Sequence, residues 1–218
     1  MKEEMGRTFL DQIYLEKEVE KLKCELAHRI DFTCMAAYQL FDYRGLESMS
    51  KAEFSECLFS YIGNTYYDRN QAYLIFLSYD QDQDLRINYR EFCRLIMPAD
   101  TVAANLLAGR GPVADRMSWE TQEIFKRLLR AHLNLEQAQE YLRQRLNKIR
   151  TTECWSLEDL FKVVDRDENG SISVYDLERL IIEHKKGGSR SIVEEIELVI
   201  AMYDKTGYHK ISFSDFSD

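Results

Sequence analysis

The sequence predicts an all-α protein with two lobes, each a pair of helix–loop–helix units, joined by a long helix and preceded by an amphipathic helix. Three observations support this prediction. Apolar residues recur at helical spacing on both sides of an acidic loop at residues 165–176. Related loops occur at residues 42–53, 80–91 and 204–215, which indicates a repeat architecture. Two further segments are charged, free of proline and periodic over many residues.

The first segment, residues 1–30, is predicted to be one amphipathic helix that begins near residue 3 and runs on into the first unit. Its apolar residues alternate at spacings of four and three: Leu15, Val19, Leu22, Leu26 and Ile30. The apolar stripe is narrow and spans under three heptads, so it does not by itself predict a coiled coil. It could pack either on a lobe of the same chain or on another chain.

Residues 31–98 form the predicted first lobe, with loops 42–53 and 80–91. The second of these loops carries metal-ligand chemistry at alternate positions: Asp80, Asp82, Asp84, Asn88 and Glu91, with Arg86 contributing its backbone carbonyl. Leu85 stands at position 6, where a left-handed backbone would cost ~1–2 kcal/mol and weaken the site. The first loop keeps only its terminal carboxylates, because Arg44 and Leu46 occupy positions 3 and 5.

Residues 99–150 are predicted to be a linker followed by a long helix from Ser118. An apolar stripe runs along this helix: Ile124, Leu128, Ala131, Leu135, Ala138 and Leu142. At ~1.5 Å per residue, the helix would extend about 50 Å. It could lie on a lobe of its own chain, which we favour, or against a partner. The segment is net positive between two acidic lobes, so it either balances them or faces an acidic partner.

Residues 151–218 form the predicted second lobe, with loops 165–176 and 204–215. The first of these has oxygen-bearing side chains at positions 1, 3, 5, 7 and 12: Asp165, Asp167, Asn169, Ser171 and Asp176. Gly170 supplies the left-handed backbone at position 6. Aspartate at position 12 reaches a cation less readily than glutamate, which shifts the preference toward Mg²⁺ or weak Ca²⁺ binding. The last loop keeps its terminal carboxylates, and we expect its apolar entering helix to be covered by the long helix or by another protein.

The loop at Asp165, with its glycine and apolar flanks, is identified as an EF-hand calcium loop, and the chain resembles a four-hand protein of the calmodulin and centrin superfamily. The resemblance covers residues 31–98 and 151–216. It implies two lobes that bind a target helix or dock on a cytoskeletal partner. More loosely, the chain resembles EF-hand proteins of ciliary and flagellar axonemes, in which decayed loops alternate with long helices. That likeness implies a fixed part of a microtubule assembly in the cytoplasm, the cytoskeleton or the cilium.

Composition narrows the function classes. A net charge of −9 disfavours a nucleic-acid binder, and apolar runs no longer than that of residues 72–77 are too short for membrane insertion. The five cysteines lack metal-ligand spacing and fit reduced side chains of a cytoplasmic protein: Cys24, Cys34, Cys57, Cys93 and Cys154. The four histidines form no catalytic pattern, so we expect no enzyme. Two classes stay open: a structural adaptor with protein partners, and a calcium sensor or regulatory subunit.

Overall fold

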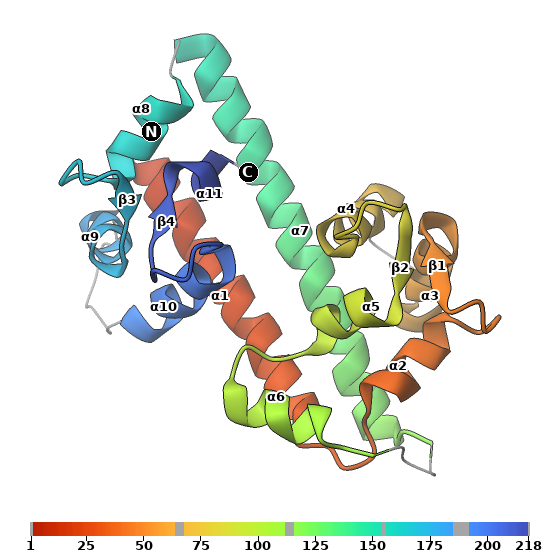
Figure 1. The fold of residues 1–218 in the computed structure, drawn as a ribbon. Coiled ribbons are helices and arrows are strands. Elements are labelled where there is room, and N and C mark those ends of the chain that lie inside the picture. Colours follow the sequence, from red (N-terminus) through yellow and green to blue (C-terminus); the bar gives the residue numbers. More distant parts are fainter. Residues whose placement is uncertain (1, 64–67, 112–115, 154–155, 185–191, 218) are drawn as a thin grey trace. The chain divides into compact units, whose positions relative to one another are not determined.

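The computed structural model describes residues 2–63, 68–111, 116–153, 156–184 and 192–217 (Figure 1). Within these ranges there are eleven α-helices and four strands of two or three residues. The all-α prediction is therefore confirmed, whereas the arrangement of the helix–loop–helix pairs as two lobes stays a prediction. Cys154 lies outside the described residues, and the other four cysteines are free thiols.

The chain divides into two compact units, and both division points fall inside a long helix. Unit 1 consists of residues 1–17 and 138–218, and unit 2 of residues 18–137. The helices that contribute to both units are α1 (Lys2–Ala27) and α7 (Trp119–Glu153). The segment boundaries expected from the sequence, at residues 30, 98 and 150, stay a prediction.

Unit 2 contains the first pair of helix–loop–helix units. Its elements between the two long helices are α2 (Cys34–Phe41), β1 (Ser48–Ser50), α3 (Lys51–Ile62), α4 (Arg69–Tyr79), β2 (Arg86–Asn88), α5 (Tyr89–Ile96) and α6 (Thr101–Ala108). The two loops are joined by an antiparallel bridge in which Met49 is paired with Ile87. Both residues stand at position 8 of their loops and are 1% exposed, so an apolar residue at this position marks the bridge.

Helix α1 ends at Ala27, which corrects the expectation that it runs on into the first unit. The Arg110 guanidinium donates hydrogen bonds to the carbonyl oxygens of Ala27, Arg29 and Phe32 at 2.5–2.7 Å, so these groups are satisfied without a continuing helix. A new helix then begins after Thr33, whose hydroxyl accepts the Ala36 N–H.

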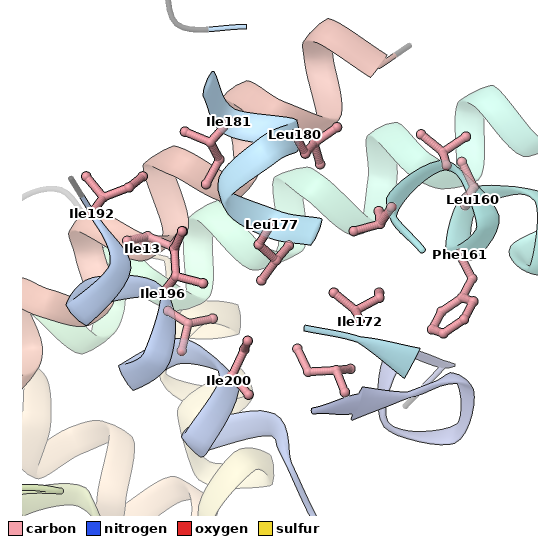
Figure 2. Close-up of a cluster of buried hydrophobic side chains, with 14 residues drawn as sticks. Ile13, Leu160, Phe161, Ile172, Leu177, Leu180, Ile181, Ile192, Ile196 and Ile200 are labelled. Atoms are coloured by element: carbon pink, nitrogen blue, oxygen red, sulfur yellow. The ribbon is translucent and has the colours of Figure 1, made fainter. Parts of the chain in front are cut away.

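Unit 1 contains the second pair. Its elements between α7 and the end of the described chain are α8 (Leu157–Val164), β3 (Ser171–Ile172), α9 (Val174–His184), α10 (Val193–Tyr203), β4 (Ile211–Ser212) and α11 (Phe213–Ser217). Ile172 is paired with Ile211 in the antiparallel bridge between the two loops. Figure 2 shows the core of this unit, in which Ile13 from α1 lies among buried side chains of α8, α9 and α10.

Candidate metal centres

All four loops share one backbone frame, although their side chains differ. The residue at position 6 has a left-handed backbone in each: Glu47 (φ 61°), Leu85 (φ 65°), Gly170 (φ 81°) and His209 (φ 55°). Each of these residues donates its N–H to the carboxylate at position 1, over distances of 2.9, 3.1, 2.8 and 2.6 Å in the same order. This bond between positions 1 and 6 holds the turn even where glycine is missing.

The far end of each loop is held by a second shared interaction. The carboxylate at position 12 accepts the N–H of position 9, and the four donor–acceptor pairs are Ser50–Glu53 (2.9 Å), Asn88–Glu91 (3.0 Å), Ser173–Asp176 (2.9 Å) and Ser212–Asp215 (2.9 Å). In unit 2 this pair also forms a capping box at the start of α3 and of α5. The position-12 carboxylate therefore stabilises the start of the helix, in addition to any role in binding a cation.

The loop at residues 80–91 brings three carboxylates together. One oxygen each of Asp80, Asp82 and Asp84 lies within 4.8 Å of the others. Asp80 is 7% exposed, and its Oδ1 has no hydrogen-bond partner among the described residues. Buried carboxylate oxygens in proteins are nearly always paired with a donor or a cation. Because this oxygen belongs to position 1 of an acidic loop, the arrangement fits a divalent cation held by oxygen ligands.

The loop at residues 165–176 keeps the fuller ligand pattern, but its acceptors are engaged by the protein. Asp165 is 2% exposed, and its two oxygens accept the N–H groups of Asn169 (3.2 Å) and Gly170 (2.8 Å). Burial raises the pKa of the Asp165 carboxyl, and the neighbouring Asp167 carboxyl raises it further. Two close carboxylates of which one is buried fit a cation, since a positive charge would relieve their repulsion.

The loop at residues 42–53 carries a cation of its own. The Arg44 guanidinium at position 3 lies 3.1 Å from the Glu53 carboxylate at position 12, and the Arg86 guanidinium lies 3.9 Å from the same carboxylate. Arg86 also donates to the Ser48 hydroxyl and carbonyl at 2.7 and 2.8 Å, which is possible because Arg86 and Ser50 are bridge partners. The guanidinium groups thus pair with the position-12 carboxylate that a metal would need as a ligand.

In the loop at residues 204–215, protein donors satisfy the first ligand. Asp204 Oδ1 accepts the hydroxyl and the N–H of Thr206 and the N–H of Gly207, all at 2.7–2.8 Å. The Thr206 hydroxyl is the main cause that lowers the pKa of the Asp204 carboxyl. With its acceptors taken up in this way, Asp204 is a poor metal ligand.

The comparison with protein families matches residues 156–218 to the EF-hand domain pair. Residues 156–218 are an EF-hand domain pair. EF-hand pairs as a class bind calcium in regulatory or structural roles. The comparison with curated proteins finds no significant match. Among the described helices, none combines the length and the apolarity that crossing a membrane requires.

The predicted ligand residues of this EF-hand protein therefore fall into two geometric groups. The side chains of Asp80, Asp82 and Asp84 converge, and in the other loop the carboxyls of Asp165 and Asp167 are close enough to shift each other's pKa. Glu91 and Asp176 accept the position-9 N–H groups described above, while Ser171 donates to the Asn169 side-chain oxygen at 2.6 Å. The assignment of all these residues as metal ligands stays a prediction.

Sequence reasoning missed the guanidinium groups of Arg44 and Arg86 as partners of Glu53. The signal was available for Arg86, since pairing of the position-8 residues places position 7 of one EF-hand beside position 9 of the other. For Arg44, the residue type showed only that a ligand had been lost.

The apolar face of the first EF-hand pair is covered by the part of α7 that belongs to unit 2. The Phe125 ring lies 5.7 Å from Phe32, 6.3 Å from Phe41 and 5.6 Å from Tyr61. Further along, His132 is 2% exposed, contacts the Tyr79 ring and forms a 2.9 Å hydrogen bond with the Leu95 carbonyl. The predicted stripe residues of α7 in unit 2 are all buried: Ile124, Leu128, Ala131 and Leu135.

The second EF-hand pair is covered by the first turns of α1 and, at Gln139 and Leu142, by α7, so the long helix expected from the sequence forms part of the cover. Ile13 is 1% exposed in the core of this pair, and Phe9 and Leu10 pack against it. The Tyr203 hydroxyl of α10 accepts a hydrogen bond from Gln12 (2.6 Å) and donates one to Glu16 (3.2 Å). The Lys17 ammonium also pairs with Glu195 of α10.

Proposed function

We propose that this EF-hand protein is a structural adaptor of a cytoskeletal assembly, with an axonemal microtubule assembly of a cilium as the favoured location. The observation that supports it best is that helices of the same chain cover the apolar faces of both EF-hand pairs. A calcium sensor uses that face as a groove for its target and exposes it on loading. A face filled with buried side chains such as Phe125 and Ile13 offers no groove wide enough for a target helix.

The state of the loops supports the same proposal. In loops 42–53 and 204–215, the ligand positions are taken by Arg44 and by the donors to Asp204. All four loops contain the same two hydrogen bonds within the protein, one between positions 1 and 6 and one between positions 9 and 12. The EF-hand frame thus persists as a scaffold, with at most two working calcium sites, at Asp80 and Asp165, and with Mg²⁺ as a second candidate at Asp165.

The cytoskeletal partner rests on the resemblance to axonemal EF-hand proteins and on the positive charge of residues 99–150 between acidic segments. Microtubule surfaces are acidic, so a net positive segment is suited to them. Within this segment Arg143 remains well exposed, with a side-chain exposure of 60%.

One observation favours a second candidate, a calcium sensor. The Asp80 Oδ1 oxygen is buried without a hydrogen-bond partner among the described residues, and a Ca²⁺ ion would supply one. In this case loading at Asp80 would change the packing of α4 and α5 around their loop.

Co-sedimentation with polymerised microtubules tests the proposal. The full chain is expected to sediment to the same extent in a calcium chelator and in calcium. A double variant, Asp80→Asn with Asp165→Asn, should behave like the wild type, because the adaptor role does not use the metal. Sedimentation only in calcium, lost in the double variant, would instead support the sensor. The absence of sedimentation in both conditions would refute the microtubule partner.

A further inference from the structure

Unit 1 contains a cavity of about 200 Å³ that the loops and their metal chemistry do not account for. Its walls come from α1, α7 and every helix of the second EF-hand pair. Most of the lining side chains are apolar: Phe9, Ile13, Leu142, Leu157, Val199 and Phe216.

The cavity lies where the covering of the second EF-hand pair is incomplete. From α1, Phe9 and Ile13 reach the cavity, and α11 contributes Phe216. The remaining space is too small for another helix, whose diameter with side chains is about 10 Å. The occupant that fits this volume is therefore a small molecule and not a further helix.

The polar groups at the cavity wall are already satisfied by the protein. The Tyr203 hydroxyl interacts with Gln12, Glu16 and Gln139, the last at 2.8 Å. The Asp215 carboxylate accepts the N–H and the hydroxyl of Ser212 at 2.9 and 2.7 Å. A ligand consequently needs no hydrogen-bonding group of its own.

The charge at the wall selects against anions. Asp215 is negative, and none of the residues that line the cavity in the described structure carries a positive charge. A carboxylate brought into this space would lose its hydration without gaining a partner. This disfavours a ligand that buries a negative charge inside the cavity and favours uncharged molecules.

We propose that this cavity is a binding site for a small, uncharged, apolar molecule about the size of toluene. A cavity of about 150 Å³ lined by aliphatic and aromatic side chains stays dry and takes up benzene. The cavity of unit 1 is larger and partly open, and its wall is mostly apolar, so an apolar molecule inside it adds dispersion contacts that the lining lacks. This site is independent of the adaptor role and of the calcium loops.

The test uses the full chain with toluene as the probe and benzoate as its charged analogue. Ligand-observed NMR should detect toluene binding with a dissociation constant below about 1 mM. At a free concentration near five times that constant, the melting temperature should rise by about 2–4 °C. Benzoate at the same concentration should give neither signal.

Two variants fill the cavity, and one matched variant does not. Leu142→Trp and Leu157→Phe enlarge lining side chains that are only half-buried, so at least one is expected to fold, as checked by circular dichroism. Either should weaken toluene binding at least tenfold. Leu106→Trp adds the same ring on α6, where Leu106 is 46% exposed and lines no part of this cavity, and should leave binding unchanged.

Undetectable toluene binding by the wild-type chain would overturn the proposal. It would also be overturned if benzoate bound as well as toluene, or if both filling variants folded and still bound toluene like the wild type. The last result would mean that toluene occupies another part of the protein.

Discussion

Replacing Leu85 by glycine should stabilise the fold without strengthening metal binding. Leu85 has a left-handed backbone at φ 65° and is 66% exposed, so its side chain contributes little packing. The protein's own bonds hold this conformation: the Leu85 N–H to Asp80 at 3.1 Å and the Arg86 N–H to Asp84 at 2.7 Å. The strain therefore weakens folding, whereas the sequence alone assigns it to calcium affinity.

The size of the effect follows from two opposing quantities. Relief of the left-handed strain contributes ~1–2 kcal/mol. The greater freedom of glycine in the unfolded chain offsets ~0.5–1 kcal/mol of this gain. The net gain in the free energy of unfolding is about 0.5–1 kcal/mol, which corresponds to a rise in melting temperature of about 1–4 °C.

The measurements are thermal unfolding and a calorimetric calcium titration of Leu85→Gly. The matched control is Gly170→Leu, at the same loop position with φ 81°, where an added Cβ would meet no atom within 4 Å. This reciprocal change should lower the melting temperature by a similar amount, again with unchanged affinity. If Leu85→Gly bound calcium about tenfold more tightly at an unchanged melting temperature, the strain would belong to the metal-binding step and the reasoning would be refuted.

Three further predictions concern other parts of the chain. Ile13→Ala should lower the free energy of unfolding in urea by about 2–5 kcal/mol, because Ile13 is 1% exposed. Tyr14→Ala should lower it by under about 0.5 kcal/mol, because Tyr14 is 46% exposed. Equal losses would exclude docking of α1. Burial lowers the pKa of His132 to about 3, below its unfolded value near 6.5, so stability is fully present above pH 6.5 and is lost as the pH falls toward 3. Between pH 7 and pH 5, the free energy of unfolding measured in urea should therefore fall by about 2 kcal/mol less for His132→Gln than for the wild type. An equal fall for both proteins would contradict the buried neutral imidazole. Arg44→Asp together with Leu46→Asp removes the nearer of the two guanidinium groups at Glu53 and adds two carboxylates, so calorimetry should detect one additional calcium site; an unchanged number of sites would show that the loop frame or the remaining Arg86 guanidinium prevents binding.

The features that depend on local periodicity could be predicted from the sequence. Both bridges could be located from the sequence, because position 8 is apolar in each loop and a bridge residue must be buried against its partner. The stripe on α7 predicted its buried face, since residues three or four apart share one side of a helix. The stripe on α1 was correct at Val19, Leu22 and Leu26 but wrong at Ile30, which is 85% exposed because the helix ends at Ala27.

The features that depend on contacts between distant residues could not be predicted. The Arg110 guanidinium that receives the end of α1 lies more than 80 residues further along the chain from Ala27. Ile13 fell outside the predicted stripe, and its burial depends on the helices of the second EF-hand pair. That the Asp80 Oδ1 oxygen has no hydrogen-bond partner among the described residues likewise depends on where the loop places each donor. Residue types alone do not determine those positions.

The composition of unit 1 has a consequence for the order in which the protein can fold during synthesis. Unit 2 is a continuous stretch and can begin to fold once residue 137 has left the ribosome. Unit 1 needs residues 1–17, which are made before unit 2, together with residues 138–218, which are made after it. Residues 1–17 must therefore wait, with Ile13 exposed, until residues 138–218 emerge. A ribosome that stalls late in the message would leave unit 2 folded and this apolar segment open to chaperones or to aggregation.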